Sequence, residues 1–263
     1  MKKDKVNELI EKSGNNFHYQ VVNFLRNKDW FVSISPYYND NMTGKPREID
    51  IVAEKEFDVK KEFGRFKGTL NVKLFIECKY INKPTVFWFD KRDKEKAIKR
   101  IVRDTPLKLP NQNNWINEHH YLEGDKVAKL FASYLDKAQD NEPIYKALSQ
   151  SLNAMVYYRS NHSIIPDEKL KGNTLKNLKY PLIICNSFKN FFEINSTDSR
   201  GYSEVNDNFQ LEINYAYLDN DKHTITDYFL IDIIGFEDKK FDAFLEKLEQ
   251  ADIKMIRSML YSM

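Results

Sequence analysis

Two stretches of this sequence decide its fold: REIDIVA at residues 47–53 and LFIECKY at residues 74–80. In both, apolar residues alternate with polar ones, which is typical of a β-strand with one face on the core. The charged segment between them contains two glycines, as expected for a surface loop. Asp50 and Glu77 lie opposite the apolar rows of their strands. Paired strands lie about 4.8 Å apart, so a hairpin would bring the two acids together.

Further elements follow from the apolar spacing around this hairpin, whose arms are predicted at 47–54 and 70–80. Helices are predicted at 15–27, 90–103, 142–158 and 238–260. Strands are predicted at 30–38, 180–186, 191–194, 209–217 and 228–235. The segment 126–134 is either a short strand or a short helix. The run YPLIICN at 180–186 is almost wholly apolar, which predicts a central strand buried on both faces.

A long connection at 104–124 is predicted to be a mobile loop, because it contains two prolines and several asparagines. His119 and His120 lie within it. Adjacent histidines rarely converge on one metal ion, so we interpret both as ordinary loop residues.

Composition limits the class of protein. Of the 263 residues, 41% are hydrophobic and 30% are charged, which argues against both a disordered chain and a membrane-inserted one. Lys and Arg total 41 and Asp and Glu 39, a net charge of +2, so a polyanion would have to bind a local basic patch. Cys78 and Cys185 are too few and too far apart for a disulfide scaffold, which favours a cytoplasmic location. The sequence shows neither a signal peptide pattern nor an apolar run long enough for a transmembrane helix.

The expected architecture is α/β (α+β), with a mixed central sheet flanked by helices. Residues 1–163 would form the core, and residues 164–263 would add strands and a terminal helix to the same sheet. The only candidate linker, at 163–175, is weak because the strand at 180–186 would complete the sheet of the first half. A single domain is therefore favoured over two.

The acidic residues of the hairpin suggest a chemistry. Glu77 and Lys79 project from the same strand face, and a nearby Asp50 would add a second carboxylate. Such oxygens are the ligands that Mg²⁺ prefers, and Mg²⁺ with a neighbouring lysine suits phosphodiester hydrolysis. An acid-x-Lys triplet occurs six times in the chain, so only the context of this one is informative. The alternative is a solvated strand face with a simple Glu-Lys pair.

The order of a helix, a strand, Asp50 and then Glu77-Cys78-Lys79 resembles the PD-(D/E)xK nuclease superfamily, which has the restriction-endonuclease-like fold. The resemblance covers residues 13–103 and begins with SGNNFHYQVVNFLRNKDWFV. It implies that Asp50 and Glu77 bind Mg²⁺ or Mn²⁺, with the backbone carbonyl of Cys78 completing the site. It also implies that Lys79 assists the attacking water. The expected activity is a Mg²⁺-dependent nuclease acting on DNA in bacterial restriction, phage defence or repair.

The first helix departs from the pattern of that superfamily. Many members carry a glutamate there, directly after an aromatic residue, but this chain has His18. Either His18 substitutes for the acid, or Glu48 supplies an oxygen, since it would share a strand face with Asp50. The plainer alternatives are a hydrogen-bonded helix residue for His18 and a surface ion pair for Glu48.

The predicted helix at 90–103 has a basic flank that would follow a phosphate backbone. Its candidate DNA contacts are Lys96, Lys99, Arg100 and Arg103. A solvated helix face is the alternative. Two other functions stay open, namely a nucleic-acid-binding or scaffolding subunit without cleavage, and a ribonuclease. A homodimer or a partner protein of a multi-component system is also compatible with the sequence.

Overall fold

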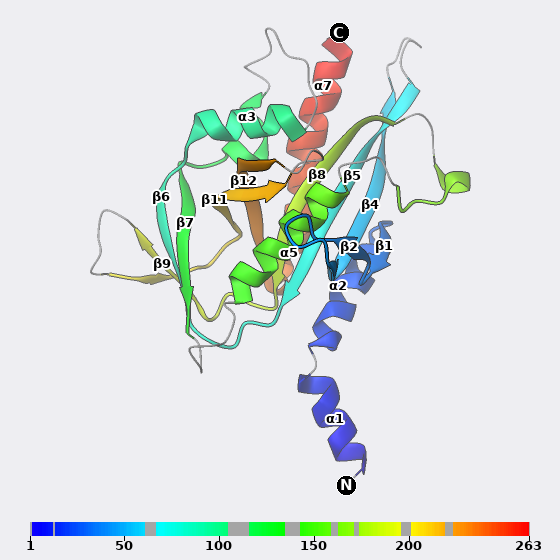
Figure 1. Cartoon of the computed structure of the whole chain (residues 1–263). Coiled ribbons are helices and arrows are strands. Elements are labelled where there is room, and N and C mark those ends of the chain that lie inside the picture. Colours follow the sequence, from blue (N-terminus) through cyan, green and yellow to red (C-terminus); the bar gives the residue numbers. More distant parts are fainter. Residues whose placement is uncertain are drawn as a thin grey trace.

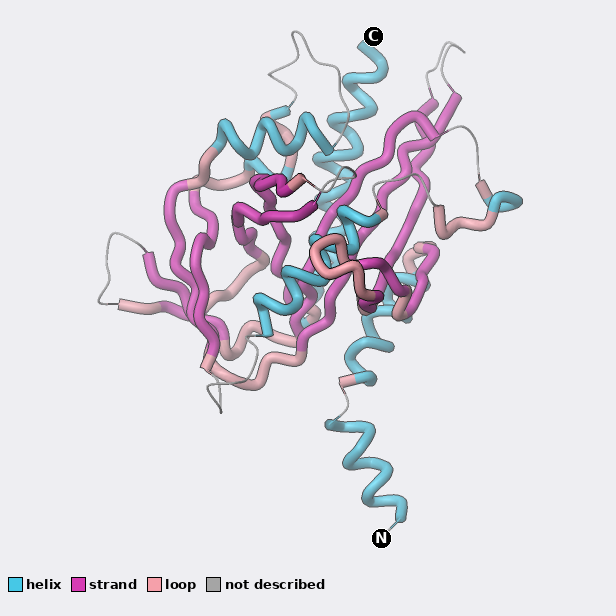
Figure 2. Tube along the Cα trace, in the orientation of Figure 1, coloured by secondary structure: helices cyan, strands magenta, loops and turns pink. Residues whose placement is uncertain are grey.

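A ten-stranded mixed sheet organises the chain, as Figures 1 and 2 show for this computed structural model. The structure describes residues 2–12, 14–60, 67–104, 116–134, 143–158, 163–170, 174–195, 201–218 and 223–262. In sheet order, the strands are β1 (Phe31–Ile34), β4 (Ile51–Lys60), β5 (Lys67–Lys79), β8 (Thr174–Cys185), β12 (Thr224–Gly235), β11 (Phe209–Leu218), β7 (Lys126–Ser133), β6 (Thr85–Lys91), β9 (Phe191–Asn195) and β10 (Ser203–Glu204). A separate hairpin pairs β2 (Tyr37–Asn39) with β3 (Pro46–Glu48).

Helices cover both faces of the sheet. These are α2 (Asn15–Asn27), α3 (Lys94–Asp104), α5 (Pro143–Tyr157), α6 (Lys240–Lys247) and α7 (Lys254–Ser262). A further helix, α1 (Lys2–Lys12), extends away from the sheet, as Figure 1 shows. A π-helical segment, Leu248–Ile253, joins α6 to α7. Short 3-10 turns lie at His120–Leu122, Asp167–Lys169 and Glu237–Lys239. The expected class, a mixed sheet flanked by helices with a helix at the C-terminal end, is confirmed.

Alternation along β5 divides the core into two layers. Leu74 and Ile76 face a cluster that includes Val21 of α2 and residues of α3, α6 and α7. Phe75 faces the other cluster, in which Leu148 of α5 is buried. Because α5 covers this second face, the polar row of β5 is not solvated, and Glu77 is fully buried. The structure therefore excludes a solvated strand face as the explanation of Glu77.

The central strands form a mixed arrangement. β5 pairs with β4 in the antiparallel sense and with β8 in the parallel sense, and β8 pairs in parallel with β12. The predicted strand at 180–186 is thus confirmed as central, although β8 begins earlier, at Thr174. Strands on both sides of residue 163 share the one sheet.

Two predicted strands are each broken in the structure. The segment 30–38 divides into β1 and β2, because Ser35 adopts a positive φ of 50° and Pro36 follows it. The segment 47–54 divides into β3 and β4, with Asp50 in a bend between them. Glu48 therefore does not share a strand face with Asp50, contrary to expectation, because Glu48 pairs with Tyr37 in the separate hairpin and Asp50 lies outside both strands.

The remaining predicted elements agree with the structure only in part. The helices at 15–27 and 142–158 and the strands at 191–194, 209–217 and 228–235 are confirmed. Residues 126–134, for which strand and helix were both open, contain strand β7. Strand β6 was not predicted, and because it includes Asp90 and Lys91, the helix predicted at 90–103 begins only at Lys94. Residues 105–115 of the predicted loop lie outside the described residues, but the remainder includes a 3-10 turn with buried side chains. Within the described part of the chain, no helix is both long and apolar enough to cross a membrane.

Candidate active site

The predicted acids meet where β4 begins and β5 ends. The register pairs Ile51 with Ile76, so Asp50 and Glu77 are the next residues beyond that pair. The backbone N–H of Asp50 donates to Oε1 of Glu77 at 3.3 Å. The hairpin thus brings together the two carboxylates that the sequence singled out.

Hydrogen bonds from three other segments hold Asp50 in its bend. Its carbonyl accepts from the backbone N–H of Ser35 at 2.8 Å and lies 2.9 Å from Nε2 of His18. Its carboxylate Oδ2 accepts from the backbone N–H of Cys78 at 2.8 Å. Because α2, the end of β1 and the end of β5 all contribute, the position of the carboxylate is fixed by tertiary structure rather than by its own strand.

Lys79 completes the cluster. Its Nζ lies 2.7 Å from Oε2 of Glu77 and 4.0 Å from Oδ2 of Asp50. The side chains are graded in exposure, at 0% for Glu77, 18% for Lys79 and 27% for Asp50. The cluster is therefore buried at Glu77 and accessible from the side of Asp50.

The electrostatics of this cluster follow from its burial. Burial raises the pKa of Glu77 to about 7, although the charge of Lys79 acts in the opposite direction. Burial lowers the pKa of Lys79, but the charges of Glu77 and Asp50 outweigh it, so the net shift is upward. Lys79 is consequently an ammonium donor at neutral pH. Glu77, with a pKa of about 7, is about half protonated at neutral pH, because the protein compensates its negative charge only in part.

This donor set fits a hard divalent cation. Asp50 and Glu77 offer carboxylate oxygens, and the Cys78 carbonyl would be a third oxygen from the same strand end. The incompletely compensated charge of buried Glu77 is what a cation would neutralise. The residues present therefore suit Mg²⁺ or Mn²⁺, the ions expected from the resemblance.

His18 and Glu48, the two auxiliary candidates, lie in different situations. His18 is half-buried on α2, and its ring contacts the backbone of Asp50 rather than a carboxylate. The carbonyl of Glu48 accepts from Nε2 of Gln150 at 2.9 Å, which ties β3 to α5. His18 is therefore a residue that positions Asp50, and Glu48 is a neighbour on the adjoining hairpin.

The basic residues of α3 divide into an exposed and an inward group. Lys96 and Lys99 are more than half exposed and pair with acids on their own helix or at its start. Arg103 is partly exposed and pairs with Asp227. Arg100 is buried, makes a bidentate pair with Asp104, and stacks over the ring of Phe229 at 3.8 Å. Its guanidinium is therefore not part of an exposed basic flank.

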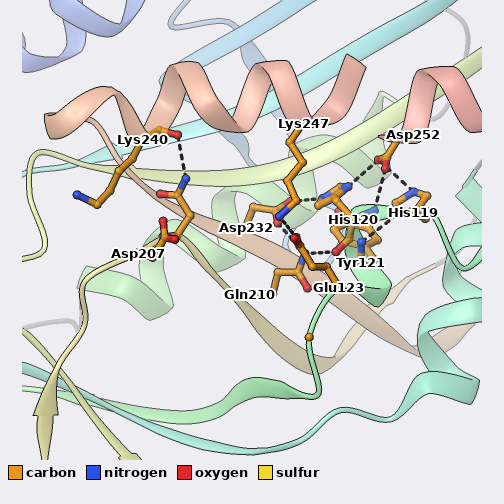
Figure 3. A network of polar contacts seen from close by, with 12 residues as sticks. His119, His120, Tyr121, Glu123, Asp207, Gln210, Asp232, Lys240, Lys247 and Asp252 are labelled. Carbon is orange, nitrogen blue, oxygen red and sulfur yellow. Dashed lines mark hydrogen bonds and ion pairs between the residues drawn. The ribbon is translucent and has the colours of Figure 1, made fainter. Parts of the chain in front are cut away.

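A buried polar network, shown in Figure 3, contains His119 and His120, which the sequence predicts to be ordinary loop residues. His120 is buried between two acids, with Nδ1 at 2.6 Å from Asp252 and Nε2 at 3.2 Å from Asp232. Asp252 also accepts from the hydroxyl of Tyr180 at 2.8 Å. One signal could have found the network, since Asp232 interrupts an otherwise apolar run at 228–235.

The hydrogen bonds identify the protonation of the two histidines. Nδ1 of His119 accepts from the backbone N–H of Tyr121, so the proton of a neutral ring must lie on Nε2, which faces Asp252. Burial lowers the pKa of His119 to about 3. Burial also lowers the pKa of His120, but the charges of Asp252 and Asp232 outweigh it and raise it to about 9. His120 is therefore an imidazolium between two carboxylates.

These protonation states bear on metal binding. His119, His120 and Asp252 are close enough together to be considered as a metal site. However, Nε2 of His119 carries a proton while Nδ1 is an acceptor, and both nitrogens of His120 face acids. Neither ring offers a free lone pair, so the network is an ion-pair assembly rather than a metal centre.

Comparisons of the chain with protein-family models, with curated proteins and with solved structures gave no match.

Proposed function

We propose that this protein is a metal-dependent nuclease that hydrolyses phosphodiester bonds in DNA, with Asp50, Glu77 and Lys79 as its catalytic residues. The observation that carries the proposal is the convergence of these side chains at one end of the β4–β5 hairpin, with Lys79 within 2.7 Å of Glu77 and 4.0 Å of Asp50. Glu77 and Lys79 are ionisable groups with little exposure. Burying such groups lowers the stability of the fold, so their presence here favours a functional role.

The residues would share the chemistry in a defined way. Asp50, Glu77 and the carbonyl of Cys78 would hold Mg²⁺, which supplies Lewis acidity toward the phosphoryl group and water. Lys79 stays an ammonium beside two acids, so it orients the attacking water and stabilises negative charge rather than removing a proton. The N–H of Cys78 and the ring of His18 keep Asp50 in place.

The substrate and setting belong to the same proposal. DNA in bacterial restriction, phage defence or repair, in the cytoplasm, is the first choice, and RNA is the alternative substrate. Both thiols of the chain are free, which is compatible with that location.

A second candidate function is binding of nucleic acid without cleavage. Among the described residues, the acids Asp50 and Glu77 have no third metal-binding side chain close enough to form a set of three. His18 occupies the helix position where a further acid was expected, and its ring contacts a carbonyl. Fewer charged ligands would weaken the metal site, and this observation favours the second candidate.

One assay separates the candidates. Purified protein is incubated with plasmid, linear duplex, single-stranded DNA and RNA, each with Mg²⁺, Mn²⁺ or EDTA. We expect cleavage that requires a divalent ion and is lost in Glu77→Gln. Asp58→Asn is the matched control, because Asp58 begins another acid-x-Lys triplet and is exposed on β4. Binding without cleavage in every metal would support the second candidate, and equal cleavage by Glu77→Gln would overturn the first.

A further inference from the structure

The polar network around His120 has no role in the proposed nuclease site. Its members Asp232 and Tyr180 come from β12 and β8, and their side chains lie on the sheet face of α2 and the C-terminal helices. Glu77 faces α5 instead, on the opposite side of the sheet. Burying this many ionisable groups is costly, and such clusters often serve a function of their own.

A cavity of about 260 Å³ adjoins the network. Asp232, Gln210 and His120 form its polar side, and Ile234, Ala243 and Phe244 form an apolar wall. Its volume lies below the ~300–1,000 Å³ usual for drug-sized ligands. The occupant is therefore about the size of one nucleoside, and a longer strand would not be enclosed.

The polar side of the cavity is preorganised by hydrogen bonds within the protein. Nε2 of Gln210 donates to Oδ1 of Asp232 at 3.1 Å, and His120 approaches Oδ2. Arg92 fixes Gln210 through a 2.6 Å hydrogen bond, and its other donors bind backbone carbonyls of the segment 121–126. Asp232 is thus held rigidly against the cavity, as a recognition group requires.

The chemistry of Asp232 selects the kind of group that binds it. Each of its oxygens accepts one hydrogen bond and retains capacity for another, because an ionised carboxylate has about four acceptor sites. The imidazolium of His120 and the guanidinium of Arg92, which interacts electrostatically with Asp232, already place two positive charges against the negative charges of Asp232 and Asp252. A further cation would over-compensate them, and two neutral N–H donors side by side fit better. The Watson–Crick edge of guanine presents such a pair, whereas adenine presents a donor next to an acceptor.

The mouth of the cavity favours one phosphate. Lys126 and Lys247 both line it, with Lys247 paired to Glu123 and Lys126 donating to Asn195 at 2.7 Å. A phosphate would take the place of these partners on the two ammonium groups. Glu123 and Asp207 also line the cavity, and their negative charge would repel a chain of further phosphates. Figure 3 shows Lys247 and Glu123 on the same side of the network as Asp232.

We propose that this cavity binds a guanine mononucleotide, with the base edge on Asp232, the ring against Ile234 and Phe244, and the phosphate between Lys126 and Lys247. The apolar wall would pack against the ring of the base. The site is independent of the nuclease residues and would remain if that function were disproved.

Calorimetric titration of the full chain tests the proposal with GMP, AMP, CMP, UMP, guanosine and inorganic phosphate as separate probes. We expect GMP to bind at least about tenfold more tightly than AMP, the effect of one charge-assisted hydrogen bond. Guanosine should bind more weakly than GMP, and phosphate alone weakest. Absence of binding by all four nucleotides, or equal affinity for all of them, would overturn the proposal. Binding of phosphate as tight as that of GMP would overturn the role of the base.

Variants then assign the contacts. Asp232→Asn should remove the preference for GMP over AMP, and Lys247→Ala should lower GMP affinity while leaving guanosine unchanged. Lys254→Ala is the matched control, because Lys254 is an exposed lysine on the same C-terminal helical segment and does not line the cavity. If circular dichroism shows that Asp232→Asn does not fold, Ala243→Trp tests the same site. Ala243 is an exposed helix residue that lines the cavity, so a tryptophan there would fill the cavity and should abolish GMP binding. Unchanged GMP binding in Ala243→Trp would contradict the assignment.

Discussion

Lys79 Nζ lies 2.7 Å from Oε2 of Glu77, and the fully buried carboxylate relies on this one cation for most of its compensation. This contact predicts how replacing either acid by its amide would affect cleavage. Glu77→Gln or Asp50→Asn should lower cleavage by more than about a hundredfold, because losses of that order follow even from removing the supports of metal ligands. Calorimetry should show weaker Mg²⁺ or Mn²⁺ binding. Full activity in either folded variant would contradict the metal site.

Lys79 itself predicts a separation of turnover from binding. Lys79→Met keeps the aliphatic stem but removes the ammonium that orients water and balances Glu77. We expect single-turnover cleavage to fall while DNA affinity and metal binding persist. Lys79→Arg is the control, since it retains positive charge near the acids. A variant that loses DNA binding but keeps its chemical rate would make Lys79 a phosphate contact instead.

His18 predicts a positioning effect. Its Nε2 lies 2.9 Å from the carbonyl of Asp50, so the ring donates to an oxygen there. His18→Gln retains an N–H donor and should keep most activity, whereas His18→Ala should lower kcat more than it raises KM. His18→Glu places a carboxylate against a carbonyl and should not rescue cleavage. Higher Mg²⁺ activity in His18→Glu would show instead that the position serves as the missing acid.

The basic residues of α3 predict two kinds of outcome. Removing Lys96 and Lys99 together should weaken DNA binding and reduce the salt dependence by roughly 0.9 per lost phosphate contact. Arg100→Ala should instead lower stability, because Arg100 is buried against Phe229 and Asp104. Filter binding at several salt concentrations and urea unfolding distinguish these effects. Unchanged salt dependence in the double lysine variant would remove α3 from the DNA surface.

The sequence predicts those parts of the site in which side chains alternate along one strand. The β4–β5 pairing and the meeting of Asp50 with Glu77 follow from two alternating segments, since register fixes which side chains are neighbours. The bend at Asp50 could not be predicted, because it depends on Ser35 and His18, which are distant in sequence.

The network around His120 could not be predicted either, because its members are distant in sequence. His120 meets Asp232 112 positions later and Asp252 132 positions later, so its partners are set only by the packing of the C-terminal helices on β12. Local patterns carry no information on such pairs. The single local sign was a charged residue within the apolar run of β12.

His120 also predicts how stability depends on pH. Its pKa is raised from 6.5 to about 9, with both neighbouring acids outweighing burial. The folded protein therefore holds a proton on His120 between these values, while the unfolded chain has lost it. The stabilisation is complete below pH 6.5 and is lost as the pH rises through 9, at about 1.4 kcal/mol per pH unit.

Urea unfolding from pH 6.5 to 9.5 measures this dependence. The wild-type chain should lose stability on the order of 3 kcal/mol over this window. His120→Gln should be less stable at pH 6.5, because it leaves two buried acids without their cation, and its profile should be flatter at higher pH. His223→Gln is the control, since His223 is exposed, and it should reproduce the wild-type slope. A His120→Gln profile as steep as that of the wild type would mean that the imidazolium between Asp252 and Asp232 does not exist.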